Sequence, residues 1–223
     1  MNFAVIVFPG SNCDHDAYHV FRHILDVPVD FVWHCDTNLK KYDAIIIPGG
    51  FSYGDYLRTG AIARFSPVMD SIIKEANIGK PVFGICNGFQ ILIESGLLPG
   101  ALIVNQDVRF LSQNVTLEVE STDSIFTKSL QKGLKLTMPI AHKQGNFIAD
   151  KDTLKMLQDE DRIAFSYSKA KKGNPNGSTD SIAGIMNKKR NVLGMMPHPE
   201  RASESILGSE DGLYIFKSMI GAS

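Results

Sequence analysis

The sequence has no apolar run long enough to cross a membrane and no excess of charge of one sign. Its longest apolar stretches are short, such as residues 44–48, whereas a spanning helix needs ~20 apolar residues. The 23 Lys and Arg residues nearly balance the 24 Asp and Glu residues, which gives a net charge of -1. A basic surface for nucleic acid or anionic lipid is therefore not indicated, and we expect neither as a partner.

Cysteine is scarce, and the N-terminus lacks the features of an export signal. The sequence has three cysteines, Cys13, Cys35 and Cys86, and no Cys-x-x-Cys pair. This odd number and wide spacing argue against a disulfide framework and against a structural zinc site. Residues 1–5 lack a basic lead and a long apolar segment. We expect a cytoplasmic protein without a bound metal, in which at most one thiol is chemically special and Cys35 serves packing.

Three short apolar segments rich in branched residues occupy residues 3–8, 44–47 and 82–86. Each is followed by turn residues and then by a helical pattern, at 14–25, 60–76 and 89–94. Repeated strand, turn and helix predict a parallel sheet, with all three turns at the carboxyl ends of the strands, where open sheets bind ligands.

The second half of the chain has a different pattern, with strand-like pieces and few helical stretches. The pieces lie at 115–119, 134–140, 162–167, 182–186 and 191–196, and a last helix is predicted at 210–220. A polar segment at 170–178 reads as an exposed loop. We predict one α/β domain over 1–223: an open, mostly parallel sheet flanked by helices, with an antiparallel flap in the second half.

Cys86 lies between two glycines at the junction of a predicted strand and helix, in Gly84-Ile85-Cys86-Asn87-Gly88. This is the pattern of a nucleophile elbow, whose glycines allow a tight and strained turn. The helix N-terminus would stabilise a thiolate and offer N–H groups to an oxyanion. Taken alone, the pattern fits a catalytic cysteine and an inert buried cysteine equally well.

A nucleophilic thiol that attacks an amide needs a base, and His198 is the best placed of the six histidines. Pro197 and Pro199 favour extended backbone around it, so that His198 and Glu200 project to the same side and the carboxylate can orient the imidazole. His15, His19 and His23 recur on one helix, but they fall on its polar stripe without an evident acidic or thiol ligand, and His34 is equally unsupported.

The attack also needs two converging N–H donors for the oxyanion. Asn87, directly after the nucleophile, can supply one, and the turn at Gly49, Gly50 and Phe51 can supply the other. Gln90 lies one helical turn beyond Cys86 on the same face and is expected to touch the substrate.

Together these residues resemble the class I, or triad, glutamine amidotransferases. The matching motifs, in the family's order, are Gly84-Ile85-Cys86-Asn87-Gly88-Phe89-Gln90 and Pro197-His198-Pro199-Glu200. Within the family the chain looks like a glutaminase subunit of purine biosynthesis, because of Phe8-Pro9-Gly10-Ser11-Asn12-Cys13-Asp14, Pro48-Gly49-Gly50-Phe51-Ser52-Tyr53-Gly54-Asp55-Tyr56-Leu57-Arg58 and Met195-Met196-Pro197-His198-Pro199-Glu200-Arg201.

The resemblance implies that Cys86 forms a glutamyl thioester with L-glutamine, that His198 transfers protons, and that Gly50, Phe51 and Asn87 serve the oxyanion. Ammonia would pass to a large synthetase subunit that uses ATP to convert formylglycinamide ribonucleotide to its amidine, with a small bridging subunit. This chain would carry no cofactor, and ATP and Mg²⁺ would bind the synthetase. One departure from the family pattern is Lys143-Gln144, where the family usually has Gly and Glu.

Three alternatives remain open from the sequence. In a peptidase-like cysteine hydrolase the histidine typically follows the cysteine directly, whereas Asn87 holds that position here. A regulatory subunit with a decayed site would have lost a member of the triad. A glutaminase of another pathway would share the catalytic motifs, but the turns at 9–14 and 51–55 favour the purine enzyme.

Overall fold

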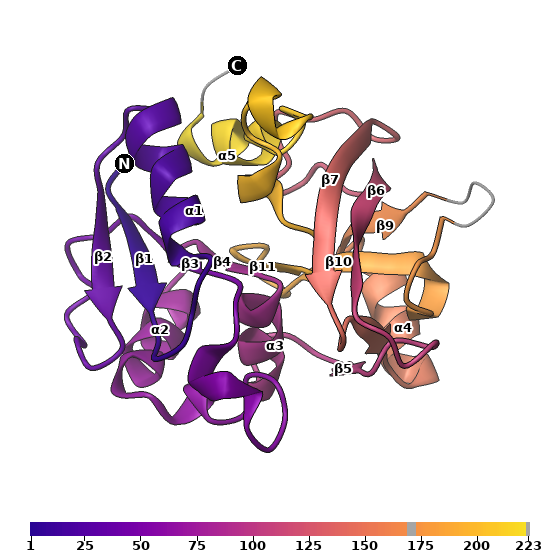
Figure 1. The fold of residues 1–223 in the computed structure, drawn as a ribbon, viewed down its shortest axis with the longest axis horizontal. Helices are drawn as coiled ribbons and strands as arrows, with labels where there is room; N and C mark the ends of the chain where they lie inside the picture. The colour runs from indigo at the N-terminus through magenta and orange to yellow at the C-terminus, as the bar shows by residue number, and fades with distance from the viewer. Residues whose placement is uncertain (169–172, 222–223) are drawn as a thin grey trace.

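The structure is a computed structural model that describes residues 1–168 and 173–221. Its main feature is a nine-stranded sheet in the order β2-β1-β3-β4-β11-β10-β9-β6-β7, which crosses the molecule from the indigo strands to the orange ones in Figure 1. The strands are β1 (Phe3–Val7), β2 (Val29–Trp33), β3 (Ala44–Ile47), β4 (Val82–Ile85), β6 (Leu111–Val119), β7 (Lys135–His142), β9 (Ile163–Tyr167), β10 (Ile182–Met186) and β11 (Val192–Met195). A separate pair is formed by β5 (Ala101–Ile103) and β8 (Asn146–Ile148).

The half of the sheet from β2 to β11 is parallel, as predicted for β1, β3 and β4, and β11 joins it although its segment was expected in the antiparallel part. The helices beside it are α1 (Asp14–His19), continued by a π-helical turn (Val20–Ile24), α2 (Pro67–Asn77) and α3 (Asn87–Glu94). The predicted helix at 60–76 is wrong at its start: a 3₁₀ turn (Ala63–Phe65) precedes Ser66, and α2 begins at Pro67, the favoured first position of a helix. Strand β2, which carries exposed positions and alternates poorly, was not predicted.

The strands from β11 to β7 pair in antiparallel fashion and extend the same sheet. The mostly parallel open sheet flanked by helices is thus confirmed, with its antiparallel part in the second half. Helix α4 (Lys151–Asp159) was missed, although Asp150 caps it by accepting a hydrogen bond from the Thr153 N–H at 2.7 Å. The last helix, α5 (Leu213–Ile220), starts three residues later than predicted.

The segment predicted as an exposed loop at 170–178 needs a correction. Residues 170–172 lie outside the described residues, but Asn176 and Ser178 are buried. The Asn176 amide donates to the Gly145 carbonyl at 2.8 Å, and the Ser178 hydroxyl accepts from the Phe147 N–H at 3.0 Å. These polar side chains are buried because they satisfy backbone groups of the segment that follows β7.

Two halves of the chain share one hydrophobic core. Phe83 of β4 packs against Phe126 and Phe216, with ring centroids 5.7 and 6.0 Å apart, so the parallel half, the antiparallel half and α5 are joined. No helix among residues 1–168 and 173–221 is long and apolar enough to span a membrane.

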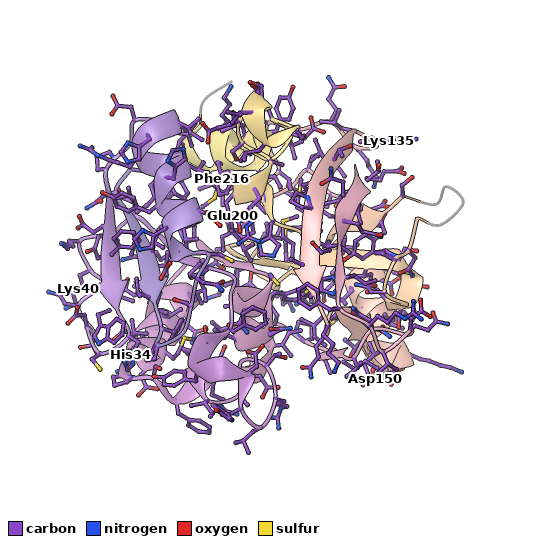
Figure 2. All side chains as sticks on the ribbon, viewed as in Figure 1. His34, Lys40, Lys135, Asp150, Glu200 and Phe216 are labelled. Carbon is purple, nitrogen blue, oxygen red and sulfur yellow. The ribbon has the colours of Figure 1, made fainter. Side chains whose placement is uncertain are left out.

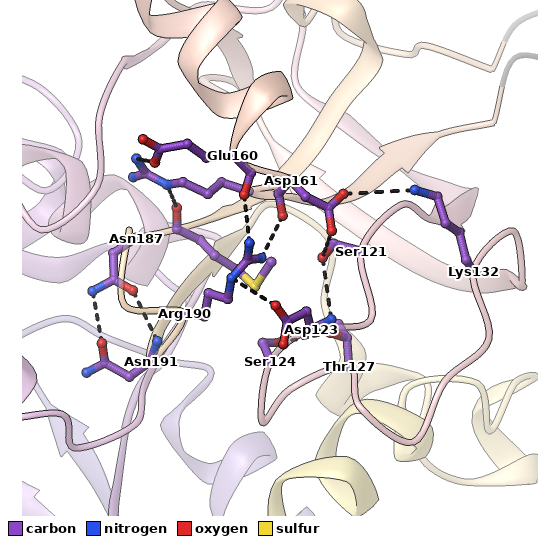
Figure 3. A network of polar contacts seen from close by, with 12 residues as sticks. Ser121, Asp123, Ser124, Thr127, Lys132, Glu160, Asp161, Asn187, Arg190 and Asn191 are labelled. Atoms are coloured by element: carbon purple, nitrogen blue, oxygen red, sulfur yellow. Dashed lines mark hydrogen bonds and ion pairs between the residues drawn. The ribbon is translucent and has the colours of Figure 1, made fainter.

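Arg190, in the turn between β10 and β11, joins several loops at one edge of the sheet (Figure 3). Its guanidinium donates to the carbonyls of Asp161 and Glu160 at 2.8 and 2.7 Å and lies 3.3 Å from the Asp123 carboxylate. Because β11 runs parallel to β4, this turn lies at the amino ends of those strands, opposite Cys86. The polar network therefore braces the sheet at the end opposite the glycine-containing turns of the parallel half.

Candidate active site

The turns after β1, β3 and β4 meet at the carboxyl edge of the parallel strands. Ser11 and Gly50 form an isolated bridge between the first two turns. A Cβ atom added to Gly49 would lie 2.8 Å from His198 Cε1 and 3.3 Å from both Cys13 Sγ and Cys86 Cβ. Segments far apart in the sequence thus converge on Gly49.

Cys86 occupies a strained turn at the end of β4, as the elbow pattern predicts. Its φ of 50° and ψ of -104° are unfavourable for a residue with a side chain, and it directly precedes α3. A Cβ on Gly88 would collide with the carbonyl of Ile47 in β3, so only glycine allows α3 to approach the sheet so closely. The thiol is consequently held at the amino end of α3, where a developing negative charge is stabilised.

His198 and Glu200 form the predicted pair, although the backbone after His198 is a 3₁₀ turn (Pro199–Arg201) and not the extended chain expected from the prolines. His198 Nδ1 lies 2.6 Å from Glu200 Oε1, and both side chains are almost completely buried. Figure 2 places Glu200 well inside the molecule, between α1 and β7. Because the carboxylate accepts from Nδ1–H, Nε2 is left to react, and it has no hydrogen-bond partner among the described residues.

The environment of His198 favours its protonated form. Burial alone would lower the pKa of His198, but the Glu200 carboxylate and the Cys86 and Cys13 sulfurs outweigh it and raise this pKa well above its usual value. A protonated imidazole beside a thiolate is the state in which a cysteine nucleophile is activated and the leaving amine can be protonated.

Cys13 lies beside His198, with its Sγ within 4.8 Å of a ring nitrogen, and this proximity was not predicted from the sequence. The Arg201 guanidinium donates to Cys13 Sγ at 3.1 Å. Burial raises the pKa of the Cys13 thiol, although His198 and Arg201 oppose this. Cys13 has no elbow geometry, so we assign the nucleophile to Cys86 and not to Cys13.

The ligand atoms of Cys13, His198 and Glu200 lie within 4.8 Å of one another, which is the spacing of a metal site. Two contacts compete with metal binding there: the hydrogen bond between His198 and Glu200 and the cationic guanidinium on Cys13 Sγ. The donors therefore fit a hydrogen-bonded catalytic group better than a resident metal.

A cavity of about 320 Å³ opens beside Cys86 and is large enough for an amino acid. Its lining residues are Gly50, Phe51, Asp55, Thr59, Cys86, Gln90, Phe110, Ala141, His142, Lys143 and Gln144. Of the expected substrate and oxyanion residues, Gly50, Phe51 and Gln90 line this cavity, whereas Gly49 and Asn87 are not among its lining residues.

Side chains of α3 are already tied together at this wall. The Asn87 amide accepts from the Ser52 N–H at 3.2 Å and donates to Gln90 Oε1 at 2.8 Å. The Gln90 amide in turn donates to the Gln144 carbonyl at 2.6 Å. Gln90 thus holds the 141–145 loop in position in addition to lining the cavity.

The loop after β7 carries the unusual Lys143-Gln144 pair, and Asn105 fixes it. The Asn105 amide donates to the His142 carbonyl at 2.9 Å, and its oxygen accepts from the Gly145 N–H at 3.0 Å and from His142 Nδ1 at 3.1 Å. Gln144 accepts from the Thr59 hydroxyl at 2.7 Å. His142 and Asn105 were not identified from the sequence, since each belongs to a segment whose path is set by distant contacts.

His142 is predicted to make folding sensitive to acid. Burial, helped by His198, lowers the pKa of His142 to about 4 from an ordinary value of 6.5, so the folded protein keeps it neutral while the unfolded chain protonates. The free energy of unfolding is therefore highest above pH 6.5, and it falls by about 3 kcal/mol as the pH is lowered toward 4.

The measurement is the free energy of urea unfolding between pH 4.5 and 7.5 for the wild type and for His142→Asn, whose amide can replace the Nδ1–H donor. Other groups also titrate in this range. The quantity of interest is therefore the difference between wild type and variant in the slope of unfolding free energy against pH. We expect the variant to lose less stability in acid, and parallel curves would contradict a buried neutral His142.

Two other expectations are corrected by the structure. Cys35 is exposed, with its sulfur near the His34 ring at 3.6 Å, and does not pack in the core. The helix histidines are exposed as expected, but His19 does have an acidic partner, because its Nε2 lies 2.9 Å from Glu204. Glu204 is 185 residues away in the sequence, so the contact depends on the tertiary fold.

Comparison with known proteins identifies the family of the chain. Residues 1–211 match the CobB/CobQ-like glutamine amidotransferase domain. A phosphoribosylformylglycinamidine synthase subunit PurQ from Koribacter versatilis is 56% identical over 227 aligned positions, covering 100% of this chain and 98% of that protein. A PurLQS structure from Thermotoga maritima superposes with a TM-score of 0.89 at 44% identity, covering 99% of this chain and 97% of the other.

A more distant structure supports the fold alone. The glutaminase domain of a Trypanosoma brucei CTPS, with bound acivicin, gives a TM-score of 0.62 at 14% identity and covers 100% of this chain and 95% of the other. With the domain match over residues 1–211 and the full-length similarity to PurQ, the chain belongs to the CobB/CobQ-like glutamine amidotransferase family.

Proposed function

We propose that this chain is the glutaminase subunit of phosphoribosylformylglycinamidine synthase, which hydrolyses L-glutamine and supplies ammonia for de novo purine biosynthesis. The observation that carries the proposal is the group of Cys86, His198 and Glu200 beside a cavity of amino-acid size, in a chain that aligns end to end with a PurQ subunit.

The chemistry follows from the geometry. The Cys86 thiolate attacks the side-chain amide carbon of glutamine, and N–H groups of Asn87 and of the Gly50–Phe51 turn stabilise the oxyanion. The proton on His198 Nε2 goes to the departing nitrogen as the C–N bond breaks. The nitrogen leaves as ammonia, and a glutamyl thioester remains on Cys86. His198 then accepts a proton from water, which attacks the thioester, and glutamate is released as the Cys86 sulfur departs.

Glu200 contributes by holding one ring orientation. Its carboxylate on Nδ1 keeps the reactive proton on Nε2 and stabilises the imidazolium between the two proton transfers. Removing one oxyanion donor in comparable sites costs about 10²- to 10³-fold in rate, so the elbow and the Gly50–Phe51 turn are both required for speed.

The remaining components belong to other polypeptides in this proposal. A large synthetase subunit binds ATP, Mg²⁺ and formylglycinamide ribonucleotide and uses the ammonia, and a small subunit bridges the two proteins. The chain itself needs no cofactor for amide hydrolysis. A reducing compartment such as the cytoplasm suits a site built around a free thiol.

The test is to mix the purified chain with a synthetase subunit and a small subunit and to measure glutamate release from glutamine. We expect slow release by the chain alone, because ammonia without an acceptor is wasted, and much faster release with formylglycinamide ribonucleotide and ATP·Mg²⁺. Release that is equally fast without partners and nucleotide would contradict a subunit role, and no release in any mixture would contradict a glutaminase.

A further inference from the structure

Two residues with charged side chains line the cavity beside Cys86, and neither has an ion-pair partner among the described residues. Asp55 and Lys143 both line the cavity, and neither takes part in an ion pair within residues 1–168 and 173–221. Arg58, the nearest cation in sequence to Asp55, is engaged by Glu94 through two contacts of 2.7 and 2.6 Å. The charges of the cavity are therefore left for a bound molecule.

Asp55 is held in place by a strained turn. Three consecutive residues have a positive φ: 55° at Tyr53, 67° at Gly54 and 54° at Asp55. Tyr53 is anchored because its N–H donates to the Pro9 carbonyl at 2.6 Å and its hydroxyl lies 2.7 Å from Ser66 Oγ. Such strain is kept where it places a functional group, and the group placed here is the Asp55 carboxylate.

Within residues 1–168 and 173–221, one neutral side chain donates to the Asp55 carboxylate. Asn87 Nδ2 donates to Asp55 Oδ1 at 3.2 Å, and the same amide group also bonds Gln90. Partial burial raises the pKa of Asp55 to about 6, and the Asn87 amide offsets this only in part. A cation placed in the cavity would restore the stability that the ionised carboxylate loses through desolvation.

Lys143 presents the complementary charge from the loop after β7. Its backbone is fixed, because the Lys143 carbonyl accepts from the Asn105 N–H at 2.9 Å, while the residue is exposed and lines the cavity. The cavity therefore contains a nucleophile, a carboxylate and an ammonium group. An α-amino acid with a side-chain amide has the matching set: a carbonyl carbon, an ammonium and a carboxylate.

We propose that Asp55 binds the α-ammonium group and Lys143 the α-carboxylate of the glutamine substrate, and that this pair makes the site selective for an intact α-amino acid. This inference rests on the proposed glutaminase function. The residues act on substrate selection, while Cys86, His198 and Glu200 carry out the chemistry.

The experiment compares ammonia release from three amides in the reconstituted complex: L-glutamine, glutaramate, which lacks the α-amino group, and 4-aminobutanamide, which lacks the α-carboxylate. Asp55→Asn keeps a hydrogen-bond acceptor for Asn87 but removes the charge. We expect kcat/KM for glutamine to fall about 10- to 100-fold in this variant, mainly through KM, while kcat/KM for glutaramate stays the same. Lys143→Met is expected to show the corresponding pattern with 4-aminobutanamide.

Asp107→Asn is the matched control, because Asp107 is exposed and removal of its charge should change none of the three reactions. An equal loss with glutamine and glutaramate in Asp55→Asn would mean that Asp55 only supports the fold of the turn, and it would overturn the inference. Failure of the wild-type complex to hydrolyse glutamine would instead overturn the proposed function, so the two outcomes are distinguishable.

Discussion

Cys86→Ala is expected to lower glutamine-dependent synthesis by the complex about 10⁴-fold or more, while synthesis from added ammonia is unchanged. The alanine removes the sulfur that forms the thioester, and the proposed synthetase subunit with its own substrates is left intact. The measurement is amidine formation by the reconstituted complex, with glutamine in one set of assays and an ammonium salt in the other.

Cys35→Ala provides the control, since Cys35 is exposed and far from the elbow in the chain. It should retain both activities. Substantial glutamine use by Cys86→Ala would show that another group, such as the neighbouring Cys13, is the nucleophile. Loss of the ammonia-dependent activity as well would mean that the substitution damages the complex as a whole.

Gly49→Ala should reduce glutamine-dependent kcat/KM about 100-fold or more, because displacing a catalytic group by about 1 Å has an effect of that size. The added Cβ would lie 2.8 Å from His198 Cε1 and close to Cys86, so the imidazole must move away from the thiol. Gly49 has an ordinary backbone conformation, and the atoms that would be contacted belong to side chains. We therefore expect the fold to survive, with a melting temperature near that of the wild type.

Gly79→Ala is the comparison for this second substitution. Gly79 has a positive φ of 105°, but a Cβ there would meet no atom within 4 Å, so backbone strain is its only effect. It should lower the melting temperature and leave kcat/KM unchanged. Wild-type activity in Gly49→Ala would show that the turn after β3 does not contact the catalytic residues during the reaction.

Local patterns were enough to predict three of the parallel strands, β1, β3 and β4, and the elbow. Gly88 is required by the close approach of α3 to β3, and Gly84 by the close approach of α3 to β4, so the motif and the structure have the same cause. His198 and Glu200 are only two residues apart and meet as predicted, but through a 3₁₀ turn (Pro199–Arg201) and not through the extended backbone expected from the prolines. Because His198 and Glu200 are neighbours in the chain, the sequence alone determined that they meet.

Features that depend on contacts between distant segments were decided by the tertiary structure. Cys13 reaches His198 only because the turns after β1 and β11 end at the same edge of the sheet. Asp55 faces the cavity because a run of left-handed residues turns it there, and Asn105 holds the 141–145 loop from another segment. The order of the strands and the paths of the loops decide which distant residues come into contact, and neither can be read from the spacing of residues in the sequence.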